Sequence, residues 1–225
     1  MPPFFIAPSI LAADFANLGA AIDAVNESDA DWFHVDVMDG CFVESISFGQ
    51  PVIASLRPRM RKPCEVHLMV DQPERHVKSM AALGVDILTV HFEACENIRS
   101  TLAAIRQAGM KAGVAISPQT PAHVIEPLLG DVHLVCIMSV VPGASGQKFL
   151  HGVLPKIQET RDMLDRYNAG TLLQVDGGID CGTIGSVIAA GATSVVAGNA
   201  VFASREGEKA AILALRSHGL CSAVL

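Results

Sequence analysis

The chain has 225 residues, of which 50% are hydrophobic and 17% charged, with a formal net charge of -7. This length and apolar content fit one large domain or two small ones with a sizeable core. Acidic and basic residues are interspersed, so the clustered Lys and Arg of a nucleic-acid-binding surface are missing and no nucleic-acid partner is expected. An acidic chain can still bind a phosphate where backbone amides do the binding.

The start of the chain and its cysteines predict a cytoplasmic protein. Residues 1–5 place no basic segment before a hydrophobic run, which argues against a secretory signal. The sequence contains no apolar run long enough to span a bilayer, so no membrane association is expected. Its six cysteines are scattered without a C-x-x-C pair, a usage typical of reduced thiols in a cytosolic enzyme.

Short apolar runs alternate with amphipathic stretches along the chain. We predict eight strands, at residues 5–11, 32–37, 65–70, 87–91, 112–116, 134–138, 172–175 and 194–197. Helical patterns lie between them, at residues 15–28, 73–83, 98–108, 154–167 and 181–190. Gly84, Gly109 and Gly191 follow three of these patterns and suit a left-handed helix end before the next strand.

Eight strand–helix units in one short chain predict an α/β fold, a single (β/α)₈ TIM barrel over residues 1–225. A doubly wound open sheet is the main alternative. It usually has fewer strands, and no G-x-G-x-x-G motif follows the first predicted strand. The barrel interpretation requires that functional residues lie at the carboxyl ends of strands.

Polar residues at the ends of three predicted strands form a candidate metal site. In the second strand His34 and Asp36 point to one face and their apolar neighbours to the other, because strand side chains alternate. Burying them in a parallel strand is costly unless they are paired or bind a metal. The third strand contains His67, and Asp176 lies at the end of the seventh. A single residue of this kind is more often a core or turn residue. Two histidines and two aspartates on one rim, however, form a ligand set that suits Zn²⁺, Fe²⁺, Mn²⁺ or Co²⁺.

Five further residues lie at the same rim. Asp39 precedes a glycine and is expected to form a turn, with support of a ligand histidine as the alternative. His91 ends the fourth strand, and we do not count it as a ligand. Met38, Met69 and Met138 either fill gaps in the core or form a water-excluding floor under the reacting carbons.

Glycine-rich loops follow the last three predicted strands. They contain Gly143, Ala144, Ser145 and Gly146 after the sixth strand, Gly177 and Gly178 after the seventh, and Gly198 and Asn199 after the eighth. Glycines let backbone N–H groups approach an anion closely. A short helix starting near Asn199 would direct its positive end to the same place. Barrel enzymes commonly bind phosphate after strands seven and eight, so these loops predict a phosphate site.

Six motifs extend over nearly the whole chain: PSILAADF at 8–15, HVDVMDG at 34–40, VHLM at 66–69, MSV at 138–140, PG at 142–143 and VDGG at 175–178. In order and spacing they resemble the ribulose-phosphate 3-epimerase family. The resemblance implies a cytosolic (β/α)₈ isomerase of the pentose phosphate pathway that interconverts D-ribulose 5-phosphate and D-xylulose 5-phosphate. It also implies a homo-oligomer.

The resemblance assigns a role to each candidate residue. It implies one divalent metal per chain, zinc before iron, manganese or cobalt, with ligands His34, Asp36, His67 and Asp176. Asp36 and Asp176 would be the two acid–base groups that move a proton at carbon 3. The implied substrate-binding residues are Ser9, His67, Gly143, Ala144, Ser145, Gly146, Asp176, Gly177, Gly178, Gly198 and Asn199.

The loops depart from the family pattern, whereas the metal and acid–base residues are intact. The departures are Glu44-Ser45 for Pro-Asn, Val141 for Asn, Ala144-Ser145 for Phe-Gly, and Asn199 for Ser. The substrate could therefore be a hexulose phosphate such as D-allulose 6-phosphate instead. A non-catalytic sugar-phosphate-binding barrel would lack one of the two aspartates, and both are present. A metal-free decarboxylase would need a lysine at a strand end, but Lys111 lies at a strand start.

Overall fold

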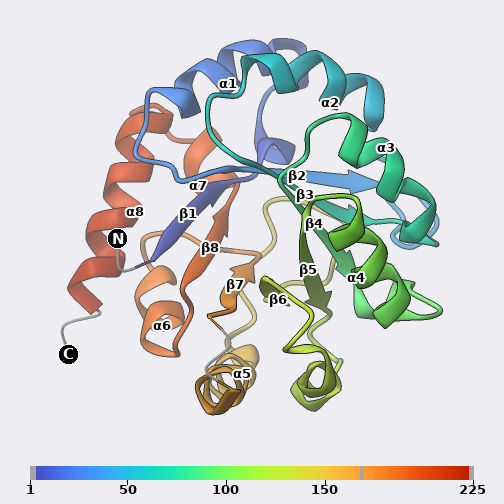
Figure 1. The fold of residues 1–225 in the computed structure, drawn as a ribbon. Coiled ribbons are helices and arrows are strands. Elements are labelled where there is room, and N and C mark those ends of the chain that lie inside the picture. Colours follow the sequence, from blue (N-terminus) through green and yellow to red (C-terminus); the bar gives the residue numbers. More distant parts are fainter. Residues whose placement is uncertain (1–3, 168–169, 223–225) are drawn as a thin grey trace.

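The computed structural model describes residues 4–167 and 170–222. Eight parallel strands form one sheet in the order β1-β8-β7-β6-β5-β4-β3-β2. A parallel bridge between Ser9 and His34 joins the two edge strands, so the sheet closes almost completely into a barrel with helices outside it (Figure 1). The predicted (β/α)₈ fold is confirmed, and the open sheet is excluded. That residues 1–225 form a single domain remains a prediction.

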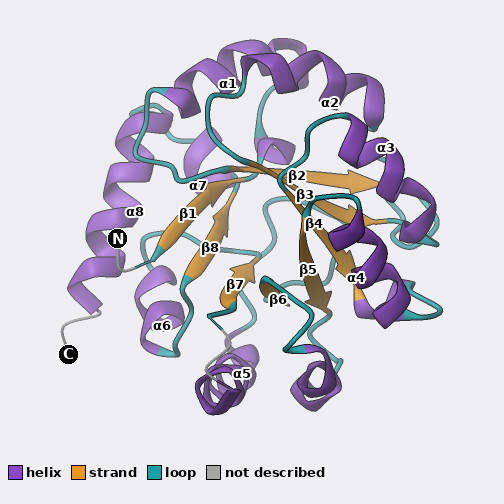
Figure 2. Cartoon of the chain, in the orientation of Figure 1, coloured by secondary structure: helices purple, strands orange, loops and turns teal. Residues whose placement is uncertain are grey.

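Strands and helices alternate along the chain (Figure 2). The strands are β1 Phe5–Pro8, β2 Phe33–Met38, β3 Cys64–Met69, β4 Ile87–His91, β5 Lys111–Ile116, β6 Leu134–Met138, β7 Leu172–Asp176 and β8 Ser194–Ala197. The α-helices are α1 Leu18–Asn26, α2 Gln50–Leu56, α3 Val77–Ala82, α4 Ile98–Gln107, α5 Leu154–Tyr167, α6 Ile184–Ala189, α7 Asn199–Phe202 and α8 Glu208–Ser222. A 3₁₀ helix, η6 Ala122–Leu128, takes the place of an α-helix between β5 and β6.

All eight predicted strands are present, and most of their bounds agree within a residue. The first strand is the exception, because it ends at Pro8 instead of residue 11. The Ser9 side chain accepts a hydrogen bond from the Leu11 amide and starts a 3₁₀ helix, η1 Ile10–Ala12, which turns the chain away from the sheet.

Helices were predicted less completely than strands. Each of the five predicted helical patterns contains a helix, and α7 begins at Asn199 as expected. The sequence analysis did not predict α2 and α8. α2 has only 7 residues. In α8 the exposed Leu213 and Leu220 obscure the apolar stripe that marks a helix packed on a core.

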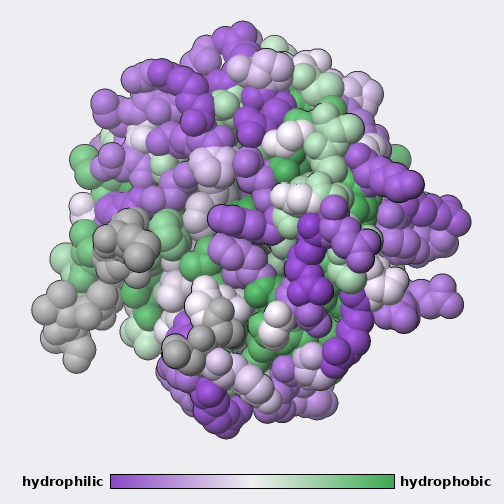
Figure 3. Space-filling view, viewed as in Figure 1, coloured by the Kyte–Doolittle hydropathy of each residue, from purple (hydrophilic) through white to green (hydrophobic). Residues whose placement is uncertain are grey.

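Side-chain alternation divides the buried residues of the barrel into two sets. Phe33, Val35 and Val37 of β2 belong to the large core cluster that also contains the buried residues of the helices. Trp32, Leu134 and other residues form a smaller cluster inside the barrel. Because Phe33, Val35 and Val37 face the outer cluster, His34 and Asp36 point to the barrel axis, as the alternation predicted. The molecular surface seen from the side of Figure 1 is largely hydrophilic, with hydrophobic residues interspersed (Figure 3).

Two of the expectations about location can be compared with the structure. Within residues 4–167 and 170–222, no helix combines the length and the apolar character needed to cross a membrane. All six cysteines are unpaired, as predicted. Residues 1–3, which bear on the expectation that no secretory signal is present, lie outside the described residues.

Candidate active site

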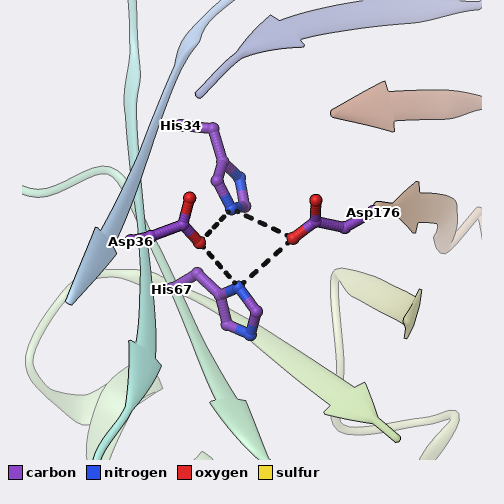
Figure 4. Close-up of side chains that lie close together, drawn as sticks. All are labelled: His34, Asp36, His67 and Asp176. Atoms are coloured by element: carbon purple, nitrogen blue, oxygen red, sulfur yellow. Dashed lines mark hydrogen bonds and ion pairs between the residues drawn. The ribbon is translucent and has the colours of Figure 1, made fainter. Parts of the chain in front are cut away.

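Three strands bring the predicted metal ligands to one rim of the barrel. His34 and Asp36 come from β2, His67 from β3 and Asp176 from β7 (Figure 4). One ligand atom from each of the four residues lies within 4.8 Å of the corresponding atom of every other. The first three residues are buried and Asp176 is partly exposed, so the cluster opens to solvent on one side.

The distances within the cluster suit a small divalent cation. His34 Nε2 lies 3.1 Å from Asp36 Oδ1 and 3.6 Å from Asp176 Oδ2. His67 Nδ1 lies 3.2 Å and 3.5 Å from the same two oxygens. Atoms bound to a cation at about 2.1 Å are separated by roughly 3.0–3.4 Å when they are adjacent ligands. Since two imidazoles and two carboxylates are also the donors that such a cation prefers, the four residues could hold a metal.

Proximity to carboxylates changes the protonation of both imidazoles in the metal-free cluster. Burial lowers the pKa of His34, but the carboxylates of Asp36 and Glu65 outweigh it and hold that pKa well above its usual value. Burial also opposes the charge of His67, yet hydrogen bonds to Asp176 and Asp36 raise its pKa to about 9. A cation must displace these protons, so metal binding should weaken as the pH falls.

Two serines fix the acidic residues of the cluster. Ser9 Oγ donates a hydrogen bond of 2.5 Å to Asp36 Oδ2. The buried Ser139, just after β6, donates from its hydroxyl to the backbone oxygens of Asp176 and Gly177, at 2.9 and 2.6 Å. The end of β7 is therefore held against β6, and the Asp176 side chain starts from a fixed backbone.

The residues behind the histidine ligands include two that the sequence analysis did not single out. The Glu65 carboxylate contacts His34, and Glu93 contacts His91, which in turn contacts His67. His91 is fully buried and is absent from the residues that line the cavity above the cluster. Asp39 forms the predicted turn, because its carboxylate accepts hydrogen bonds from backbone amides and from neither ligand histidine.

A cavity of about 650 Å³ lies above the cluster. Asp36 and Asp176 form part of its floor together with Met38, Met69 and Met138, each of which is at most 4% exposed. The cavity wall contains every residue of the predicted phosphate loops: Gly143, Ala144, Ser145, Gly146, Gly177, Gly178, Gly198 and Asn199. The catalytic and phosphate predictions, made from separate parts of the sequence, therefore fall in one cavity.

Contacts between the predicted phosphate loops bring them into one wall. Ser145 Oγ, after β6, donates a 3.1 Å hydrogen bond to Asn199 Oδ1 at the start of α7. Both residues are departures from the family pattern, and they contact each other. Gly178 has a φ of 64°, and a Cβ there would lie 2.4 Å from the Phe149 amide nitrogen, so the loop after β7 requires glycine for its packing. Lys148, which the sequence analysis did not name, adds a cation to the lining.

The fold and the rim cluster define a (β/α)₈-barrel enzyme with a candidate metal centre beside glycine-rich loops. Residues 5–202 match the family described as the ribulose-phosphate 3 epimerase family. The chain belongs to this family, and it is an isomerase of the epimerase kind.

Individual relatives agree with the family match. The chain is 47% identical over 206 residues to the ribulose-phosphate 3-epimerase of Bacillus subtilis (strain 168), covering 91% of this chain and 95% of the relative. It is 43% identical to the chloroplastic ribulose-5-phosphate-3-epimerase of Arabidopsis thaliana, covering 89% of this chain and 72% of the relative. Among solved structures, KGPDC from Streptococcus mutans superposes with a TM-score of 0.69 at 14% identity, covering 97% and 98% of the two chains, which supports the fold alone.

Proposed function

We propose that the chain interconverts D-ribulose 5-phosphate and D-xylulose 5-phosphate by moving a proton at carbon 3. The observation that most supports this reaction is the pair Asp36 and Asp176, whose carboxylates face each other between His34 and His67 (Figure 4). Both aspartates line a cavity walled by glycine loops. The names of the Bacillus subtilis and Arabidopsis thaliana relatives support the pentulose phosphate as substrate. Such a reaction belongs to carbohydrate metabolism, in the pentose phosphate pathway.

Two carboxylates on different strands suit an inversion at carbon 3. One of them, ionised, accepts the proton beside the ketone, and the other, protonated, donates a proton to the opposite face. The Ser9 hydroxyl holds the carboxylate of Asp36, and Ser139 holds the backbone from which the Asp176 side chain extends. A bound divalent cation supplies Lewis-acid stabilisation of the negative charge that develops on the substrate oxygens.

We further propose that His34, Asp36, His67 and Asp176 hold one divalent ion per chain, with zinc as the first expectation and iron, manganese or cobalt as alternatives. The ring of nitrogen–oxygen distances from 3.1 to 3.6 Å supports this ligand set. Elemental analysis of gently purified protein should find the ion, and stripping it should abolish activity. Full activity in demonstrably metal-free protein would refute the proposal.

The glycine loops are proposed to hold the phosphate through backbone amides, with Ser9 and His67 close to the sugar. Ser9 lines the cavity between the cluster and the loops, which agrees with this placement. His67 is fully buried behind the floor of the cavity. It would therefore act on the substrate through the metal that it is proposed to bind. The three methionines would exclude water from the reacting carbons. Unphosphorylated ketoses turned over as well as phosphorylated ones would contradict the phosphate assignment.

A hexulose phosphate is the second candidate substrate, and one observation favours it. A second cavity of about 650 Å³ shares Pro142, Gly143, Ala144 and Gln147 with the first, where the family pattern has a bulky Phe at Ala144. A substrate panel of pentulose and hexulose phosphates, measured by kcat/KM, decides between them. A preference for D-allulose 6-phosphate would overturn the pentulose assignment. The cytoplasmic location and the homo-oligomeric state remain predictions.

A further inference from the structure

His34 uses both of its ring nitrogens inside the barrel. Nε2 faces the candidate metal centre, and Nδ1 lies 3.1 Å from Glu65 Oε2. Glu65 is 0% exposed, and three more donors hold its carboxylate: Trp32 Nε1 at 2.9 Å, Gln174 Nε2 at 2.8 Å and Thr89 Oγ1 at 2.8 Å. A carboxylate held from several strands is a rigid acceptor, so it can fix the ring orientation of His34.

The packing of β5 leaves space for one of these donors. A Cβ at Gly113 would lie 2.3 Å from the Thr89 hydroxyl oxygen. Any larger residue at this position would displace the Thr89 side chain and remove its hydrogen bond to Glu65. Gly113 therefore preserves the surroundings of the buried glutamate.

His67 has a corresponding arrangement with one more residue in it. Its Nε2 lies 3.0 Å from His91 Nε2, and the two rings stack with centroids 5.0 Å apart. His91 Nδ1 lies 3.1 Å from Glu93 Oε2. The other oxygen of Glu93 accepts hydrogen bonds from the Ser117 amide and the Thr120 hydroxyl. Each histidine of the cluster is thus connected, on the side away from the cluster, to an anchored glutamate.

Proton placement in neutral imidazoles makes both connections directional. A nitrogen that binds a cation must be unprotonated, so in the metal-loaded cluster the remaining proton of His34 would lie on Nδ1 and be donated to Glu65. In His67 the proton lies on Nε2 and is donated to His91 Nε2. The proton of His91 then lies on Nδ1 and is donated to Glu93. No other placement of one proton on each ring satisfies all of these contacts.

We propose that Glu65 and Glu93 are positioning residues for the metal centre, Glu65 acting directly on His34 and Glu93 acting on His67 through His91. This inference rests on the metal centre of the proposed function and adds which residues prepare it. The glutamates keep the tautomer that presents an unprotonated nitrogen to the cation and prevent ring rotation. Partners of this kind, outside the ligand set, typically change metal affinity by about 10–100-fold.

The test measures the affinity of metal-free protein for Zn²⁺ and Co²⁺ by competition with a chelator, and the visible absorption of bound Co²⁺. Glu65→Gln and Glu93→Gln should each raise the Kd by roughly 10–100-fold. His91→Phe, which keeps an aromatic ring but no nitrogen, should have an effect similar to that of Glu93→Gln.

Double variants distinguish an effect transmitted from Glu93 through His91 to His67 from general structural damage. Because Glu93 acts through His91, Glu93→Gln with His91→Phe should raise the Kd little more than either change alone. Glu65→Gln with Glu93→Gln should give nearly multiplied effects, since they act on different histidines. Asp31→Ala is the control, because it removes the carboxylate that accepts from Arg216 and the Ile6 amide, neither of which belongs to the two connections, and it should lower stability without changing the Kd.

Each outcome decides one question. An unchanged Kd in folded Glu65→Gln and Glu93→Gln proteins would overturn the inference while leaving the metal centre in place. Multiplied effects of Glu93→Gln and His91→Phe would overturn the connection through His91. If Glu65→Gln does not fold, the Glu93 and His91 variants still decide the second connection. A wild-type chain that binds neither metal overturns the metal centre and this inference together.

Discussion

In its metal-free form the folded chain should lose stability as the pH rises, and the pKa of His67 sets the pH range. Its pKa in the folded, metal-free cluster is about 9, against an ordinary value of 6.5. The folded state therefore binds this proton more tightly than the unfolded state does. The resulting stabilisation is complete below about pH 6.5 and is lost as the pH rises through about 9. A pKa difference of about 2.5 corresponds to roughly 3 kcal/mol of unfolding free energy.

Urea unfolding of chelator-treated protein at several pH values between about 6.5 and 9 measures this loss. The pKa of His34 is also raised, so its contribution changes in the same direction. Metal-loaded protein is the matched control, because a cation would displace one proton from each ring and remove this cause of the decline. If the unfolding free energy of metal-free protein is constant or increases over the range, the electrostatic account of the cluster is wrong.

Two further predictions concern catalysis and the phosphate loops. Asp36→Asn and Asp176→Asn should each lower kcat by at least about 10²–10⁴-fold, as expected for the loss of a general acid or base. The metal content of each variant is measured in parallel. An Asp176→Asn protein that keeps its metal and near-normal activity would contradict the acid–base role of Asp176. The Ser145–Asn199 hydrogen bond should contribute about 0.5–1.5 kcal/mol to substrate binding. A double-mutant cycle of Ser145→Gly and Asn199→Ser, read from KM, measures this contribution. Additive effects of the two changes would show that the contact is unimportant.

Strand periodicity is the reason that the fold and the clustering of the four candidate ligands could be predicted from the sequence. In a barrel of parallel strands, polar residues two apart point to the axis, and residues at strand ends share one rim. That rule located His34 and Asp36 on β2, His67 on β3 and Asp176 on β7 without any knowledge of distances. Which atoms of the side chains face one another depends on rotamers, and the sequence pattern does not contain that information.

The same rule, applied once more, would have found the buried glutamate. Glu65 lies two residues before His67, and Gln174 two residues before Asp176, so both point to the barrel axis. Their hydrogen bond joins residues 109 positions apart. The sequence analysis treated Glu65 only as the start of a strand. A buried acidic residue in phase with a predicted metal ligand is therefore a usable signal for a residue that supports the ligand.

The contacts between loops could not be predicted, because they depend on how separate loops converge. Ser145 and Asn199 are 54 residues apart and follow different strands. Each was identified singly as a departure from the family pattern, and their pairing became visible only in the folded chain. Lys148 was missed for the same reason, since no periodic pattern places a loop lysine beside a cavity.

The direct test of the central claim is the fate of the hydrogen at carbon 3. D-Ribulose 5-phosphate is turned over by metal-loaded protein in deuterated water, and the D-xylulose 5-phosphate formed is analysed by NMR. Two carboxylates, Asp36 and Asp176, on opposite faces predict solvent deuterium at carbon 3 of the product, because the second carboxylate delivers a proton other than the one removed. Product that retains its original hydrogen at carbon 3 would contradict the two-carboxylate account.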